Sequence, residues 1–235
     1  MKTVVFDLDG TLVDSAPDLQ AAANRLMRQN GLPELDLATI ICFIGNGMAR
    51  LVELCFARYG SLPADLPDQV ARFKRFYSEE DHRRTRFMPG AELALRRLSA
   101  AGITLGLCTN KDEGVARTLL AKLQVGGLFA GFVGGDSGLP RKPDPAPLLA
   151  CVERCRTFPR EALYVGDSEI DAVAAEAAGI RFFLYRGGYH TVASARFSHL
   201  TRISNLAELP CLLVPILGSA TQQLRTKSVP PASSG

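Results

Sequence analysis

Hydrophobic and polar positions follow two different patterns along this chain, and the change falls near residue 84. A short apolar run, residues 4–6, opens the sequence. Between residues 15 and 84 the apolar side chains then recur at three- and four-residue spacing, which is typical of amphipathic helices. The helices predicted for this stretch cover residues 17–30, 36–43, 47–59 and 65–82.

From residue 89 onward the pattern predicts strands and helices in alternation. The strands are almost wholly apolar, as expected when helices cover both faces of a parallel sheet. The predicted strands cover residues 103–108, 132–133, 162–165 and 181–185, and the predicted helices cover residues 91–101, 112–123, 145–156 and 169–178.

The two patterns together predict an α/β fold with an insertion. A doubly wound parallel-sheet, Rossmann-like core is expected from residues 1–14 and 85–218. A helical cap, residues 15–84, is inserted after the first strand. The polar residues 219–235, rich in proline and serine, are predicted to form a mobile tail.

Composition narrows the functional classes. Hydrophobic residues make up 47% and charged residues 22% of the 235 positions, which is ordinary for a soluble globular protein. The net charge of +3 is too small to indicate a nucleic acid or a membrane as partner. The six cysteines form no C-x-x-C pair and are expected to be reduced. The first strand begins so early that no signal peptide is expected before it. The predicted location is the cytoplasm.

Two carboxylates stand where the first apolar strand ends. Asp7 and Asp9 are two positions apart, so an extended backbone points both side chains the same way. Acidic groups at the exit of a buried strand are costly unless a cation or a reaction requires them. The sequence therefore predicts a functional site at this edge of the sheet.

Polar residues also follow two later strands, at the edge where ligands bind in such sheets. Thr109 can hold phosphate oxygens, although a threonine after a strand is also a common helix cap. Lys142 lies among prolines, on a stiff segment that can hold its charge in place, or it is a surface residue of a turn. Asp167 can bind Mg²⁺. Asp171 either joins the acidic site or closes a capping box with Ser168.

These segments occur in the order of the four motifs of the haloacid dehalogenase-like phosphatases, which the chain resembles from residue 2 to about residue 217. The resemblance implies that Asp7 attacks the phosphorus of a monoester and becomes an aspartyl phosphate. It implies that Asp9 donates a proton to the leaving group and later takes one from water. The resulting catalytic set is Asp7, Asp9, Thr109 and Lys142.

The resemblance also implies a set of ligands. Phosphate oxygens are expected to meet Gly10, Thr109, Asn110 and Lys142. The expected cofactor is Mg²⁺, held by Asp7, the backbone carbonyl of Asp9 and Asp167, with Asp171 supporting them from behind.

The predicted cap contains one segment that bears on the substrate. A Gly45-Asn46-Gly47 turn opens a helix whose free N–H groups can bind an anion, with Arg50 one turn away, although such a turn can also be a flexible loop. The segment resembles the cap of phosphoglycolate phosphatases, which implies 2-phosphoglycolate as substrate, with Asn46 and Arg50 reading its carboxylate.

Other functions stay open at this point. A broad sugar-phosphate or nucleotide phosphatase, a β-phosphoglucomutase-like phosphoryl transferase and a non-catalytic binding module with a relict site are the alternatives. The expected partner is a small phosphate ester, with no nucleic acid and no membrane. The chain is expected to be a monomer or a homodimer.

Overall fold

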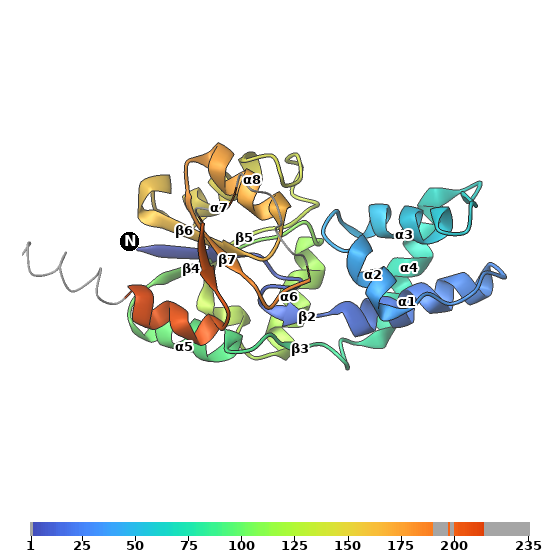
Figure 1. The fold of residues 1–235 in the computed structure, drawn as a ribbon, viewed down its shortest axis with the longest axis horizontal. Coiled ribbons are helices and arrows are strands. Elements are labelled where there is room, and N and C mark those ends of the chain that lie inside the picture. The colour runs from blue at the N-terminus through green and yellow to red at the C-terminus, as the bar shows by residue number, and fades with distance from the viewer. Residues whose placement is uncertain (1, 190–196, 198–199, 214–235) are drawn as a thin grey trace, which may run out of the picture.

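The chain forms an α/β core that carries a helical cap at one end (Figure 1). The structure is a computed structural model that describes residues 2–189, 197 and 200–213. The predicted tail, residues 219–235, lies outside the described residues.

The core is built on a six-stranded sheet in which every strand pair is parallel. The strand order is β5-β4-β1-β6-β7-β8. These strands are β1 (Thr3–Phe6), β4 (Thr104–Cys108), β5 (Phe129–Val133), β6 (Ala162–Gly166), β7 (Arg181–Tyr185) and β8 (Thr201–Ile203). The prediction of a parallel-sheet α/β core is confirmed, whereas β8 has no counterpart among the predicted strands.

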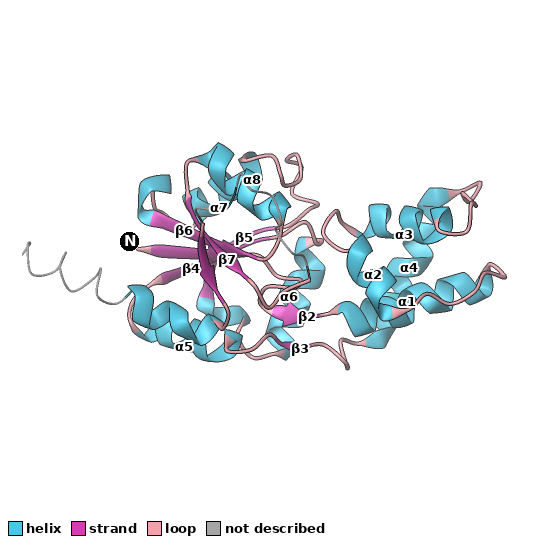
Figure 2. Cartoon of the chain, in the orientation of Figure 1, coloured by secondary structure: helices cyan, strands magenta, loops and turns pink. Residues whose placement is uncertain are grey.

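Helices cover both faces of the sheet (Figure 2). Successive residues of β1 point to opposite faces: Val4 and Phe6 join one apolar cluster, and Val5 joins the other. The first cluster is closed by α5 (Ala91–Ala100) and α6 (Glu113–Lys122), and the second by α7 (Ala146–Arg154) and α8 (Glu169–Ala178). In the part of the core that the structure describes, the 3₁₀ turns are η1 (Gly126–Leu128), η2 (Pro159–Glu161) and η4 (Leu206–Glu208).

The cap consists of four helices with a hydrophobic cluster of their own. They are α1 (Ala16–Gln29), α2 (Leu37–Phe43), α3 (Met48–Ala57) and α4 (Leu66–Glu80). Prolines near the first turns of α1 and α4 suit those positions because proline lacks the N–H that would be unpaired there. The aromatic residues Phe73, Phe76 and Tyr77 of α4 are fully buried in this cluster.

Two linkers join the cap to the core, and hydrogen bonds fix both. They contain β2 (Val13–Asp14) and β3 (Arg86–Phe87), which pair in antiparallel fashion. The buried Asp18 carboxylate accepts hydrogen bonds from the backbone N–H groups of Arg84 and Thr85 and from the Thr85 hydroxyl. The cap therefore enters and leaves the core at one defined place.

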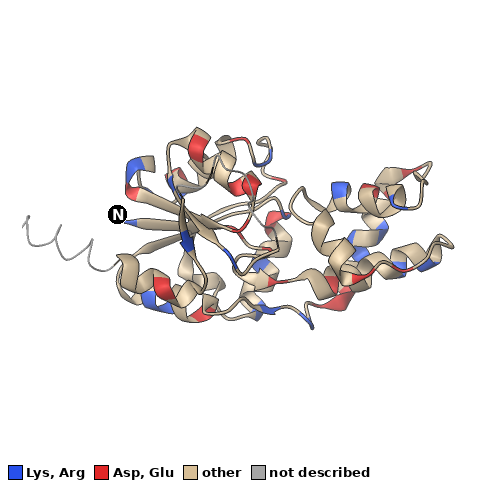
Figure 3. Cartoon of the chain, in the orientation of Figure 1, with Lys and Arg blue, Asp and Glu red and all other residues tan. Residues whose placement is uncertain are grey.

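Lys and Arg are interspersed with Asp and Glu over both the core and the cap (Figure 3). Within the part of the chain that the structure describes, no helix has the length and apolar character needed to cross a membrane.

Candidate active site

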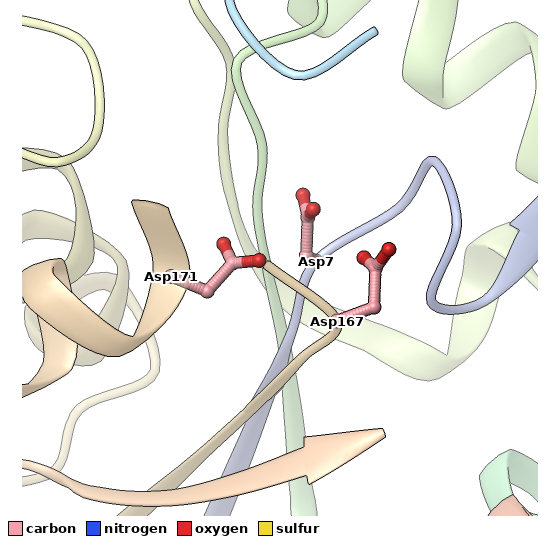
Figure 4. Close-up of side chains that lie close together, drawn as sticks. All are labelled: Asp7, Asp167 and Asp171. Carbon is pink, nitrogen blue, oxygen red and sulfur yellow. The ribbon is translucent and has the colours of Figure 1, made fainter. Parts of the chain in front are cut away.

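Three strands of the sheet deliver polar side chains to one place at their carboxyl ends. Asp7 follows β1, Thr109 follows β4 and Asp167 follows β6. Asp7, Asp167 and Asp171 offer carboxylate oxygens that all lie within 4.8 Å of one another, and their side chains gather in Figure 4. The structure thus brings together the acidic residues that the sequence singled out.

The loop after β1 wraps against Asp167. Gly10 has a φ of +82°, and a Cβ there would lie 2.5 Å from the Asp167 Oδ2 atom, so a side chain at this position has no room. The Thr11 hydroxyl donates to Asp167 Oδ1 at 2.8 Å, and the backbone N–H of Tyr189 donates to Oδ2 at 2.8 Å. Gly10 therefore fixes how closely the loop approaches this carboxylate.

Lys142 is a buried cation between two carboxylates. Its ammonium lies 2.9 Å from Asp7 and 2.7 Å from Asp171, and it donates to the Tyr164 hydroxyl at 2.7 Å and to the Cys108 carbonyl at 3.0 Å. Burial opposes the charged form, but the two carboxylates outweigh it and raise the pKa of Lys142 above its ordinary value. The lysine therefore stays charged next to Asp7.

Asp171 performs both of the roles that the sequence suggested. It closes the capping box of α8 with Ser168, and its other oxygen, Oδ1, accepts from Lys142 and from Tyr164. Burial opposes its charged form, but Lys142 and these hydrogen bonds lower its pKa. With both oxygens engaged, Asp171 holds the lysine in position.

Asp7 is the member of the acidic group whose pKa is raised by its surroundings. Burial, together with the charges of Asp171 and Asp167, raises its pKa to about 7, although Lys142 acts in the opposite direction. A carboxylate in this setting gains stability from any added positive charge. The site is therefore suited to bind a cation, and with it an anionic ligand that the cation contacts.

Asp9 points into the same cavity but has different neighbours. Its carboxylate accepts a hydrogen bond from the Ser15 hydroxyl at 2.5 Å. The ammonium of Lys111 lies 3.1 Å from Oδ1 and 3.0 Å from Oδ2. Asp7 and Asp9 therefore each pair with a separate lysine.

The segment after β4 supplies two further polar groups. The Thr109 oxygen accepts the backbone N–H of Lys111 at 3.2 Å, which leaves its O–H available to a ligand. The Asn110 amide bonds both the N–H and the carbonyl of Lys142, at 3.0 Å each, and donates to the cap carbonyl of Gly45 at 2.8 Å. The side chain of Asn110 thus holds the Lys142 loop and the cap, and because the residue also lines the cavity, its binding of phosphate stays a prediction.

The cap covers the cavity with apolar residues. Its side chains along the cavity are Leu19, Ile44, Met48 and Leu51. Gly45 and Gly47 also line the cavity, whereas Asn46 and Arg50 do not. Asn46 is exposed, and Arg50 forms an ion pair with Glu53 at 2.7 Å on the outer side of α3. The structure therefore does not bring the two predicted cap residues to the site.

Two site residues were not identified from the sequence. Lys111 follows Thr109 and Asn110 directly. A lysine so close to the end of a buried strand could have been predicted from the sequence as a site residue. Tyr189 accepts the N–H groups of Ser15 and Ala16 and donates to Asp14, so it ties the core to the first linker of the cap. Only the tertiary structure reveals that contact.

Known proteins resemble this chain along most of its length. The family model described as haloacid dehalogenase-like hydrolase matches residues 4–185. A phosphoglycolate phosphatase of Cereibacter sphaeroides is 44% identical over 220 residues, which cover 92% of this chain and 100% of the relative. A phosphoglycolate phosphatase of Rhodospirillum rubrum is 40% identical over 214 residues, covering 88% of this chain and 89% of the relative.

A similar solved structure also spans nearly the whole molecule. It is titled as a predicted phosphoglycolate phosphatase from Haemophilus somnus, with a TM-score of 0.80 and 28% sequence identity. The match covers 90% of this chain and 97% of that chain, so both the core and the cap fall within it.

Proposed function

Because the chain belongs to the haloacid dehalogenase-like hydrolase family, we propose that it is a Mg²⁺-dependent phosphomonoester hydrolase that converts 2-phosphoglycolate to glycolate and phosphate. The observation that carries the proposal is the placement of Asp7. Its carboxylate lines the cavity 2.9 Å from the buried cation Lys142, and Asp9 lines the same cavity.

The chain's own residues account for both halves of the reaction. A carboxylate oxygen of Asp7 forms a bond to phosphorus while the ester P–O bond breaks, and Asp9 gives a proton to the departing alkoxide. Water then attacks the phosphorus of the aspartyl phosphate and passes a proton to Asp9, which releases phosphate and restores Asp7. Lys142 and the Thr109 hydroxyl stabilise negative charge on the phosphoryl oxygens.

The donor set fits Mg²⁺. Asp7 and Asp167 offer hard carboxylate oxygens within 4.8 Å of each other, and we assign the third protein ligand to the backbone carbonyl of Asp9. We do not assign Asp171 as a metal ligand, since its oxygens already bind Lys142, Tyr164 and Ser168. Its role is to hold Lys142 next to the ligands. When bound, the ion would add positive charge next to the phosphoryl oxygens.

The choice of 2-phosphoglycolate is supported by the size of the cavity and by the relatives. The cavity is small, with a volume of about 40 Å³, and apolar side chains line it on the cap side. The curated relatives at 40–44% identity carry the name phosphoglycolate phosphatase. We place the reaction in the cytoplasm and propose a chain that acts as a monomer or homodimer.

Metal removal provides one test of this proposal. We expect EDTA to lower the hydrolysis of 2-phosphoglycolate by at least about a hundredfold, since the phosphoryl charge then lacks its main counter-charge. Added Mg²⁺ should restore the rate. The measurement is phosphate release with and without chelator, with Ca²⁺ as a comparison because it prefers more ligands at longer distances. Full activity in metal-free buffer would exclude a metal-dependent reaction.

A steady-state substrate screen tests the specificity. We expect kcat/KM for 2-phosphoglycolate to exceed that for hexose phosphates and nucleoside monophosphates by at least about tenfold, because the apolar cap side chains along the cavity offer no hydrogen-bond partners to a sugar or a base. Comparable rates on all of them would indicate a broad phosphatase. Phosphate returned to a sugar instead of to water would indicate a transferase, and no turnover at all would indicate a binding module.

A further inference from the structure

Lys111 is a buried cation in the cavity to which the family motifs assign no role. It follows β4, and only 2% of its side chain is exposed. It lines the same cavity as Asp7, Asp9 and Lys142. A lysine is seldom buried to this extent without a functional or structural reason, because removing its charge from water is costly.

The two cavity lysines differ in what surrounds them. Lys142 contacts two carboxylates, a phenol and a backbone carbonyl, so its ammonium is enclosed by protein groups. Lys111 contacts Asp9 and lies 4.8 Å from the ring centre of Tyr77, on cap helix α4. Burial opposes its charge, but Asp9 raises the pKa of Lys111 above its ordinary value, so it stays a cation.

The ring of Tyr77 packs against the Lys111 ammonium from the cap. Burial raises the pKa of this tyrosine to about 12, so it is a neutral phenol at physiological pH. A neutral aromatic face attracts a cation without neutralising it. The ammonium of Lys111 is therefore held between the Tyr77 ring and the Asp9 carboxylate on the wall of the cavity, where an anion bound in the cavity would share its charge with Asp9.

The proposed substrate carries two anionic groups. Among the described residues that line the cavity, Lys142 and Lys111 are the ones with positive charge, and the cap adds apolar side chains. Lys142 serves the phosphoryl group next to Asp7. An ester with a second anion needs a second cation, and Lys111 is the one in reach.

We propose that Lys111 binds the carboxylate of the substrate. It thereby selects phosphate esters in which a single carbon atom separates the carboxylate from the ester oxygen. This inference rests on the proposed function. Asp9 must approach the ester oxygen to give it a proton, and Lys111 lies 3.0 Å from Asp9. In 2-phosphoglycolate a single methylene separates that oxygen from the carboxylate, so the carboxylate reaches the ammonium beside Asp9.

The test compares two substrates that differ in the carboxylate. Ethyl phosphate has the two-carbon chain of 2-phosphoglycolate without that charge. We expect Lys111→Met to lower the ratio of kcat/KM for 2-phosphoglycolate to that for ethyl phosphate by at least about tenfold, as loss of a charged hydrogen bond predicts. Lys111→Arg, which keeps the charge, should retain most of the ratio. Arg50→Met is the matched control and should leave the ratio unchanged.

Each other outcome overturns the proposal in a recognisable way. An equal loss of kcat/KM on both substrates in Lys111→Met would mean that the lysine serves only Asp9. A ratio that falls in Arg50→Met would mean that the cap recognises the carboxylate.

Lys111→Gln replaces Lys111→Met if circular dichroism shows that the latter does not fold. If the wild-type protein does not prefer 2-phosphoglycolate, the substrate assignment fails together with this inference; if it does and Lys111→Met keeps the preference, only the inference fails.

Discussion

Asp7→Asn should lower kcat for 2-phosphoglycolate by at least about 10⁴-fold, the scale on which removal of a catalytic nucleophile acts. An amide is a poor nucleophile, and the other residues of the site cannot replace the bond that Asp7 forms with phosphorus. The fold should survive. Burial raises the pKa of this carboxyl to about 7, which means that its surroundings favour the neutral form, and asparagine is neutral.

The control for this variant is Asp36→Asn. Asp36 is an exposed N-cap of α2, and its loss should affect stability slightly and turnover hardly at all. Activity is read with 2-phosphoglycolate and with p-nitrophenyl phosphate, and folding by thermal unfolding in EDTA. An Asp7→Asn protein that hydrolyses either substrate at the wild-type rate would disprove the assignment of the nucleophile.

Lys142→Met should impair both catalysis and stability. Removing the ammonium leaves the carboxylates of Asp7 and Asp171 close together in the protein interior without their cation. Breaking a buried ion pair in this way costs about 3–5 kcal/mol of unfolding free energy. We expect kcat to fall by at least about 10³-fold, since the phosphoryl oxygens also lose a fixed counter-charge.

Urea unfolding and phosphate release measure these two effects separately. Lys74→Met is the matched control, because Lys74 is half-exposed and its ion pair with Asp112 lies at the surface. Exposed pairs contribute about 0–1 kcal/mol, so this variant should resemble the wild type. A Lys142→Met protein with wild-type stability would mean that the buried charges around Lys142 are compensated in another way.

The parallel sheet and its acidic edge were predictable because each depends on local sequence. The apolar runs that became β4 and β6 bring polar residues to the same edge in any parallel sheet. The paired carboxylates of Asp7 and Asp9 and the capping box of Ser168 and Asp171 likewise lie within a few residues of each other. Spacing alone was therefore informative.

The cap side of the site could not be predicted in the same way. Whether Arg50 faces the cavity depends on how α3 is rotated, and in the structure it lies exposed and paired with Glu53. The contacts of Asn110 with Lys142 and Gly45 join segments that are 32 and 65 residues away along the chain. The two-residue strands β2 and β3 are too short to produce any periodicity. These features arise from packing and not from local pattern.

Trapping of the covalent intermediate tests the central claim most directly. The experiment is a rapid-quench single turnover with Mg²⁺ and 2-phosphoglycolate that is radiolabelled in its phosphoryl group. The account predicts that the label appears on the protein before phosphate is released, and that the labelled protein disappears as phosphate is released. Reduction of the quenched protein with borohydride should convert residue 7, and no other aspartate, to homoserine. Label on another residue, or phosphate release without any labelled protein, would contradict an aspartyl phosphate on Asp7.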